Sequence, residues 1–168
     1  MLRERTRLEK SIEQVRGLEQ ELEDSITLIE LGDAEDDQDV IGEGENTITI
    51  LQRRAEKLEL ESLLSGEVDG NDCYIEINAG AGGTESQDWA EMLVRMYLRW
   101  GDRNDYKTEV LDTQYGDEAG IKSATVLFTG DYAFGYLKAE IGVHRLVRIS
   151  PYDSNKRRHT SFASVFAY

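Results

Sequence analysis

The stretch Gly142-Val-His-Arg-Leu-Val-Arg-Ile-Ser-Pro-Tyr-Asp-Ser-Asn-Lys-Arg-Arg-His-Thr-Ser-Phe162 predicts a strand, a polar loop and a second strand. The first strand is expected to end at Ile149, because Pro151, the only proline, fixes φ and lacks a backbone donor. The loop is rich in turn-forming residues and returns through a basic run at 156–159 to a β-rich segment at 160–168. Hydroxyls and an aromatic ring beside concentrated positive charge suit unstacked bases next to phosphates, although an ordinary hairpin with a basic loop has the same composition.

The charge of the chain is unevenly distributed. Its 168 residues are 39% hydrophobic and carry a formal net charge of −15 at pH 7. Neutralising phosphates needs an excess of Lys and Arg, so general binding to nucleic acid is not expected. The segment 137–159 is the exception, with six Lys and Arg residues against two acidic ones. A basic edge on an acidic body favours a targeted contact.

Cysteine use and hydropathy indicate a compartment. Cys73 is the only cysteine, so no internal disulfide is expected, which is consistent with a reducing compartment. The charged segment 1–7 does not have the apolar region of a signal peptide, and no apolar run approaches the length of a membrane span. We therefore expect a cytoplasmic protein without a membrane partner.

Two helices are predicted in the first third of the chain. Apolar residues recur at steps of three or four over 3–31, which is typical of an amphipathic helix. The acidic segment 32–39 has the composition of a loop that ends a helix, and its spacing does not fit a calcium loop. A second helix is expected over 46–64, where Gly42 and Gly44 weaken an earlier start. The two helices predict a hairpin, which could bind a partner or be only a small bundle.

The remainder predicts a sheet with helices. Strands are expected at 72–78, 106–114 and 121–129 and in the hairpin that begins at Gly142, with a short helix at 131–140. Another helix lies after the first strand; we interpret its apolar stripe as core and expect Gly101 to end it. The stripe comprises Trp89, Met92, Leu93, Met96, Tyr97 and Trp100. The predicted fold is α+β: a helical hairpin, residues 1–64, followed by an α/β domain, residues 65–168, with a mostly antiparallel or mixed sheet.

The glycine-rich segment Gly80-Ala-Gly-Gly-Thr-Glu85 follows a strand and opens a helix, where an anion could bind. It does not match a Walker loop, because no Lys follows the last glycine, and its spacing differs from the dinucleotide fingerprint. Thr84 and Gln87 fit a capping box, so the segment could be only a capped turn. We expect no nucleotide cofactor and no metal site, and we interpret Asp88 and Glu91 as solvated charges.

Two motifs carry a resemblance to a known family. His144-Arg-Leu-Val-Arg-Ile-Ser-Pro-Tyr-Asp-Ser and Arg157-Arg-His-Thr-Ser-Phe162 resemble the stop-codon-reading segment of bacterial class I peptide chain release factors, of the release factor 2 type. Ala79-Gly-Ala-Gly-Gly-Thr-Glu-Ser-Gln-Asp-Trp-Ala90 resembles a second motif of that family. The resemblance runs from about Leu64 to Tyr168 and more loosely through the helices before it.

The resemblance implies recognition of the stop codons UGA and UAA, with the small-subunit decoding centre of the ribosome and the messenger RNA as partners. The family's tripeptide Ser-Pro-Phe stands here as Ser150, Pro151 and Tyr152. The Ser150 hydroxyl can donate and accept, so it could tolerate A or G as the second base. The backbone near Gly83 and the carboxylate of Glu85 are implied contacts of the first base, U.

Further roles follow from the same resemblance. His159 is expected to stack between the second and third bases, and Val147 and Thr160 are expected to contact the third. Four arginines are expected to support the loop or to meet ribosomal RNA phosphates, namely Arg145, Arg148, Arg157 and Arg158.

The resemblance does not extend to catalysis. Members of the family hydrolyse peptidyl-tRNA through a Gly-Gly-Gln loop, whereas the one Gly-Gly pair here, Gly82-Gly83, is followed by Thr84. We therefore expect no catalytic residues and a truncated member or fragment that recognises codons without releasing peptide. The alternative is a truncated paralogue that acts as an RNA-binding regulator, which tight binding to free RNA would favour.

Overall fold

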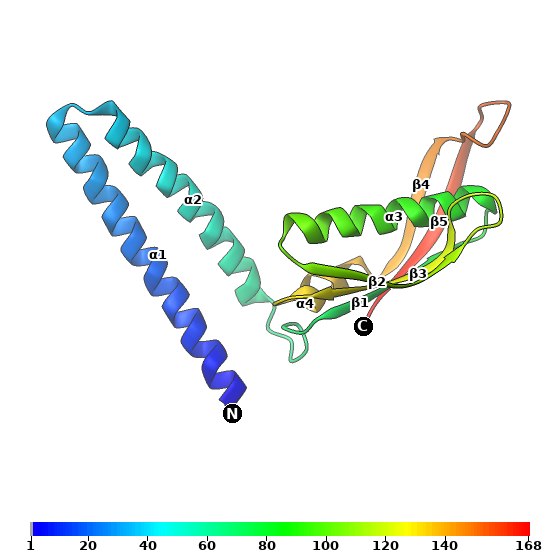
Figure 1. The fold of residues 1–168 in the computed structure, drawn as a ribbon, viewed down its shortest axis with the longest axis horizontal. Coiled ribbons are helices and arrows are strands. Elements are labelled where there is room, and N and C mark those ends of the chain that lie inside the picture. The colour runs from blue at the N-terminus through cyan, green and yellow to red at the C-terminus, as the bar shows by residue number, and fades with distance from the viewer. Residues whose placement is uncertain (1) are drawn as a thin grey trace. The chain divides into compact units, whose positions relative to one another are not determined.

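The computed structural model describes residues 2–168, except the side chains of residues 2–4, 7 and 10. The chain divides into two compact units, unit 1 (residues 1–63) and unit 2 (residues 64–168) (Figure 1). Unit 1 contains α1 (Leu2–Glu35) and α2 (Gln38–Leu63). Unit 2 contains β1 (Cys73–Ala79), α3 (Thr84–Arg103), β2 (Lys107–Tyr115), β3 (Ile121–Thr129), α4 (Ala133–Leu137), the 3-10 turn Lys138–Glu140, β4 (Gly142–Ile149) and β5 (Arg158–Ala167). Among the described residues no helix has the length and apolar character that crossing a membrane requires.

The predicted helical hairpin is present, but the connection between its helices is shorter than expected. The prediction of a loop over 32–39 is wrong, because α1 continues through Gly32. Asp36 leaves the helix with φ 54°, and the backbone N of Asp37 donates to the Gly32 carbonyl at 2.8 Å. The Asp37 carboxylate then accepts from the backbone N of Asp39 at 3.0 Å. A left-handed residue closes one helix and an aspartate caps the next, so two residues make the turn.

Helix α2 begins at Gln38, which is earlier than the predicted start at Asn46. Gly44 lies inside it, where a Cβ atom would stand 2.5 Å from Cγ1 of Ile29 and 3.2 Å from the Ser25 carbonyl oxygen on α1. The glycine therefore lets the two helices approach closely, and this packing outweighs the low helix propensity of glycine.

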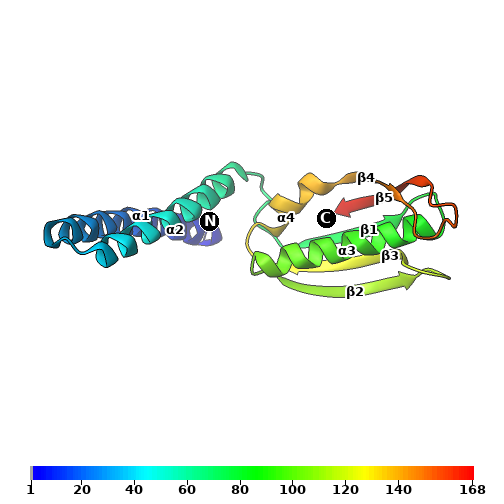
Figure 2. The same ribbon diagram turned by 90° about the horizontal axis from the view of Figure 1, so that it is seen from above.

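Unit 2 has the predicted α+β architecture. Its sheet has the order β2-β3-β1-β5-β4, and every neighbouring pair is antiparallel. Helix α3 lies across one face of this sheet (Figure 2). The core between them is built from the helix residues Ala90, Leu93 and Tyr97 and the strand residues Ile75, Ile77, Ala124, Val126, Phe128, Ala163 and Val165. The prediction of the fold class is confirmed.

Helix α3 departs from the prediction in two details. It continues through Gly101 to Arg103. Gly101 is buried, and a Cβ there would stand only 2.6 Å from Cγ2 of Thr108, so the close approach of α3 to β2 requires a glycine. The apolar stripe is also not entirely core. Leu93 is 1% exposed, whereas Met96 is 46% exposed. A helix on one side of a sheet buries only the face that it turns toward the strands, and the predicted stripe is wider than that face.

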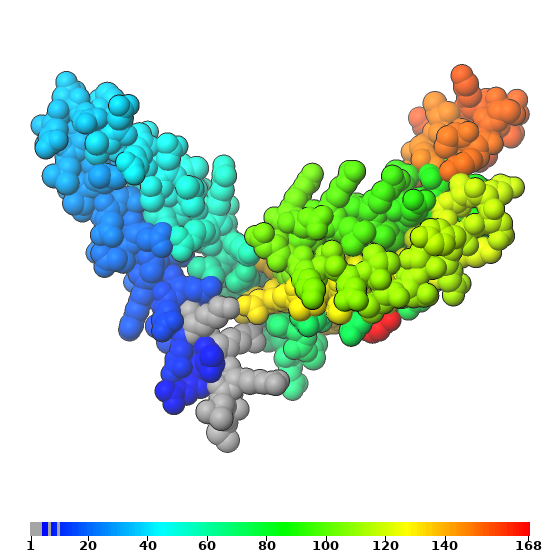
Figure 3. All heavy atoms as spheres, in the orientation of Figure 1, coloured from blue at the N-terminus to red at the C-terminus, as the bar shows by residue number. Residues whose placement is uncertain are grey.

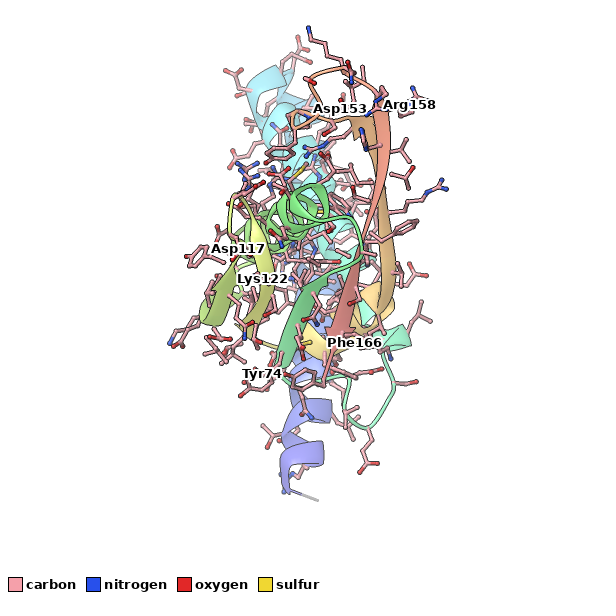
Figure 4. The ribbon with its side chains drawn as sticks, turned by 90° about the vertical axis from the view of Figure 1, so that its right-hand side faces the viewer. Tyr74, Asp117, Lys122, Asp153, Arg158 and Phe166 are labelled. Carbon is pink, nitrogen blue, oxygen red and sulfur yellow. The ribbon has the colours of Figure 1, made fainter. Side chains whose placement is uncertain are left out.

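The two ends of the sheet differ in character. Asp153 and Arg158 lie at the end that carries the β4–β5 loop, and Tyr74 and Phe166 lie toward the other end (Figure 4). The rings of Tyr74 and Tyr168 stack there with centroids 5.8 Å apart. The aromatic stack therefore lies at the end of the sheet opposite the loop, and the predicted site lies at the loop end.

Candidate nucleic-acid interface

The β4–β5 loop is a stiff projection at the tip of unit 2 (Figures 1 and 3). The strands pair in register up to Ile149 and Arg158. Beyond them the backbone N of Ser150 donates to the Arg157 carbonyl at 3.1 Å, and that of Lys156 donates to the Asp153 carbonyl at 2.9 Å. Pro151 is exposed. Backbone hydrogen bonds alone therefore restrain the loop, and the side-chain contacts add to them.

The predicted loop and the predicted helix start meet in one hydrogen-bonded cluster. Ser150 is only 5% exposed, and its hydroxyl donates to Oε2 of Glu85, on the first turn of α3, at 2.5 Å. The same hydroxyl oxygen accepts from the backbone N of Tyr152 at 3.1 Å. Residues 65 positions apart in sequence are thus joined directly. The two motifs belong to one site.

Arg148 is the last residue but one of β4, and its side chain connects this strand to α3. Its Nε donates to Oε1 of Glu85 at 2.6 Å, its Nη2 donates to Oδ2 of Asp88 at 2.5 Å, and its Nη1 lies 3.5 Å from Sδ of Met92. Burial lowers the pKa of Arg148, but the hydrogen bonds and charges of Glu85 and Asp88 outweigh this effect and raise it. Arg148 is therefore occupied in supporting the loop.

Asp88 belongs to this cluster, although the sequence alone did not place it there. The prediction that Asp88 is a solvated charge is wrong, because its side chain is 19% exposed and paired with Arg148. Glu85 and Asp88 stand three residues apart, so they share one face of α3. That spacing was visible in the sequence, but the arginine that faces both carboxylates comes from a distant strand.

Tyr152 stands at the edge of this cluster and is 47% exposed. Partial burial and a hydrogen bond to Asp88 raise the pKa of the Tyr152 hydroxyl. The extra hydroxyl, relative to the phenylalanine of the family's tripeptide, therefore lies near the Asp88 carboxylate. The ring itself stays accessible beside the loop.

His159 and Arg157 are tied to the loop through Asp153. Oδ2 of Asp153 lies 2.8 Å from Nε2 of His159 and accepts from Nε of Arg157 at 2.7 Å, while Oδ1 accepts from the backbone N of Asn155 at 2.9 Å. The hydrogen bonds of His159 and Arg157 hold the pKa of Asp153 below its usual value. The imidazole is consequently oriented by the loop.

Val147 and Thr160 lie on the other face of the hairpin. They are direct cross-strand partners, and the next pair along the ladder is Arg148 and His159. Because side chains alternate between the faces of a sheet, Val147 and Thr160 point away from the cluster of Ser150 and Glu85. Arg145 and Arg158 share this second face by the same alternation. The predicted site residues are thus divided between two faces.

Gly83 is the N-cap of α3, with φ 60° and ψ −139°. This conformation favours glycine, and a Cβ there would meet no atom within 4 Å, so the backbone is open to a ligand. The predicted capping box is wrong. The Thr84 hydroxyl donates to Oε2 of Glu118 at 2.8 Å, and the Ser86 hydroxyl contacts the carbonyl of Gly83 at 2.9 Å.

Comparison with known proteins finds relatives that match this chain over nearly its whole length. The chain is 60% identical over 168 residues to peptide chain release factor 2 of Paramagnetospirillum magneticum and 55% identical to that of Roseobacter denitrificans, and it covers 45% of each. It is similar to the structure of RF2 of Thermus thermophilus, with a TM-score of 0.66 and 41% identity, over 96% of this chain and 45% of that one. The chain therefore spans less than half the length of these relatives.

The family assignment rests on a match over nearly the whole chain. The PCRF domain matches residues 1–165, which includes both the helical hairpin and the sheet with its loop. This protein is therefore a member of the PCRF domain family.

Proposed function

We propose that this chain recognises the stop codons UAA and UGA in the A site of the ribosome and acts in translation termination. The observation that carries the proposal is the hydrogen bond between Ser150 and Glu85, which joins the tripeptide loop to the start of α3. The basic loop beside it suits messenger and ribosomal RNA. We assign codon recognition, and not peptidyl-tRNA hydrolysis, to the residues of this chain.

The Ser150 hydroxyl is suited to reading either purine as the second base. It has one proton, which it gives to Glu85, and lone pairs that can accept. The amino group at position 6 of adenine can donate a hydrogen bond to this hydroxyl oxygen while the hydroxyl proton stays directed at Glu85. Guanine presents an oxygen there, so the hydroxyl must turn its proton from Glu85 to the base. Arg148 remains bonded to Glu85 during this exchange and keeps the carboxylate paired.

The first and third bases are assigned to the flanks of this cluster. The open backbone at Gly83 can approach the pairing edge of U, where a fixed donor and acceptor reject cytosine. Val147 and Thr160 lie across the hairpin from Ser150, so the second and third bases bind on different faces. His159 is proposed to stack between them, which fits bases that cannot stack directly on one another.

Ribosome filter binding tests the proposal. We expect the chain to be retained on ribosomes with UAA or UGA in the A site and to be retained less with UAG or UGG. Equal retention for all four codons would contradict codon recognition. Tight binding to free RNA in the absence of ribosomes would instead favour an RNA-binding regulator.

Variants of the loop make this test specific. Ser150→Ala and Tyr152→Ala are expected to reduce the preference for UAA over UGG, and loss of the Ser150 contact should cost about tenfold, the equivalent of one hydrogen bond. Tyr152→Phe removes only the hydroxyl and should keep the preference. Ser154→Ala, at an exposed loop serine, is the matched control. A control that loses as much preference as Ser150→Ala would remove Ser150 from codon reading.

A further inference from the structure

A groove runs along the side of α3 that faces away from the sheet. It has a volume of about 550 Å³ and is lined by Met92, Arg95, Met96, Arg99, Trp100 and Arg103, which together we call the α3 groove. Within unit 2 this side of the helix is not covered by a strand or another helix (Figures 1 and 2). The groove is therefore an accessible surface of unit 2 that the proposed codon contacts do not use.

The basic wall of the groove is regular. Arg95, Arg99 and Arg103 are exposed and occur at steps of four residues, so their Cα atoms rise by about 6 Å from one to the next along the helix. Glu91 begins the same row, which leaves three positive charges against one negative. The described residues provide no ion pair for these three arginines, in a chain whose net charge is −15.

The other wall of the groove is apolar. Met96 is 46% exposed, and Trp100 stacks on Tyr106 with ring centroids 5.1 Å apart and an interplanar angle of 20°. The stacked pair holds the indole rigidly at one end of the groove. Guanidinium groups beside an exposed thioether and an aromatic ring can bind phosphates and also cover the sugar and base edges of a nucleic acid.

The groove is continuous with the codon cluster. Of the residues that line the groove, Met92 lies nearest the N-terminus of α3. Its Sδ lies 3.5 Å from Nη1 of Arg148, and Nε of Arg148 donates to Glu85. A strand of RNA that leaves the Ser150 loop over α3 would meet the row of arginines next.

We propose that the α3 groove binds the phosphate backbone of RNA, as a contact separate from codon reading. Arginine rather than lysine at all three positions favours phosphate, which a guanidinium can bind through two hydrogen bonds. An acidic protein segment would match the charge but would leave the regular spacing and the aromatic wall without a role. The choice of ribosomal RNA as the natural ligand rests on the proposed function, whereas binding of RNA by the groove does not.

The salt dependence of ribosome binding tests the proposal. The triple variant Arg95→Gln, Arg99→Gln, Arg103→Gln should weaken binding to ribosomes equally for UAA and for a sense codon. It should also reduce the slope of log affinity against log salt concentration by about 2 to 3, the value for three lost phosphate contacts. The control Arg16→Gln, Arg53→Gln, Lys57→Gln changes the charge equally at exposed positions of unit 1 and should leave the slope unchanged.

The outcomes separate this proposal from the codon proposal. An unchanged slope in the α3 variant, or an equal fall in the unit 1 control, would overturn the groove as an RNA contact. Loss of codon preference with an unchanged slope would place the arginines in codon reading instead. A parent chain without any codon preference would contradict the proposed function. The salt-dependence slopes of the parent and the variant could still be compared.

A second measurement does not need the ribosome. The indole N–H signals of Trp89 and Trp100 can be followed by nuclear magnetic resonance during titration with a short single-stranded RNA. Trp89 donates to the His144 carbonyl at 3.1 Å, so its signal is the internal reference. We expect the Trp100 signal to move and the triple arginine variant to abolish the movement. No movement with RNA, or an equal movement with a poly-glutamate peptide, would refute an RNA-specific groove.

Discussion

Arg148 is the residue on which the candidate site depends. Its side chain is 25% exposed and binds two carboxylates, Glu85 and Asp88, which are 9% and 19% exposed. Two carboxylates this close on one helix face would repel each other without the cation between them. The Ser150 hydroxyl donates a further hydrogen bond to Glu85 in the same cluster. The arginine thus allows a negatively charged helix start to hold the β4–β5 loop through Ser150.

Replacement of Arg148 by methionine should therefore destabilise unit 2. We expect Arg148→Met to lower the free energy of unfolding by about 3 kcal/mol at pH 7, at the lower end of the cost of breaking a buried pair, because the guanidinium is partly exposed. The raised pKa of Arg148 keeps its guanidinium charged at pH 7, so both carboxylates have a cation beside them in the parent chain. In the variant the two carboxylates share one helix face without a cation between them.

Urea unfolding followed by tryptophan fluorescence measures this difference, because Trp89 and Trp100 both belong to unit 2. Arg145→Met is the control, since Arg145 is exposed on the opposite face of the same strand. The control should change stability by less than about 0.5 kcal/mol. A deficit of Arg148→Met no larger than that of Arg145→Met would show that the pairing of Arg148 with the two carboxylates does not govern the stability of unit 2.

At the scale of the elements, two glycines of α2 make a matched pair. A Cβ at Gly42 would meet no atom within 4 Å, whereas one at Gly44 would stand 2.5 Å from Cγ1 of Ile29. Gly42→Ala should stabilise the hairpin by about 0.5–1 kcal/mol through helix propensity. Gly44→Ala should destabilise it by about 1–2 kcal/mol, because the overpacking of α1 exceeds the same gain. Circular dichroism at 222 nm in urea measures both, and equal stabilisation by the two variants would contradict the close approach.

The same glycines show what could be predicted from the sequence. Strands were placed within one or two residues of their observed bounds because alternation is a local signal; 121–129 was predicted as it is observed. Helix ends were misplaced at Gly32, Gly44 and Gly101. Each was interpreted as a helix breaker, but each makes room for a neighbour that is distant in the sequence or beyond a turn. Propensity is local, and the space that a missing side chain provides is tertiary.

The candidate site was likewise predicted from the sequence only in part. The tripeptide loop and the helix start at Glu85 were predicted from two sequence motifs, and their hydrogen bond joins them. The pairing of Asp88 with Arg148 and the position of Val147 on the opposite hairpin face were not predicted. Both depend on the register of β4 against β5 and on its placement over α3, which a single sequence does not encode in any short stretch.

At the scale of the whole molecule, the two units differ in how much apolar surface they bury. In the described part of unit 1, Leu51 is the buried hydrophobic residue, at 5% exposure, while Leu8, Ile12, Val15 and Leu22 are 41–59% exposed. Unit 2 contains the continuous core beneath α3. Because apolar burial is the main favourable term in folding, unit 1 should be much the less stable of the two.

We therefore expect the chain to unfold in two steps, and Cys73 provides the means to separate them. Its thiol is fully buried in β1, and burial raises its pKa to about 11, so it should not react with a thiol reagent at neutral pH until unit 2 opens. The 34 and 26 residues of α1 and α2 dominate the helical signal of the chain. With rising urea, ellipticity at 222 nm should fall first, while Cys73 stays protected and the fluorescence of Trp89 is unchanged. Labelling of Cys73 and the fluorescence change should then occur together at higher urea, because both report on unit 2. If all three signals change at one urea concentration, the two units unfold as a single cooperative body.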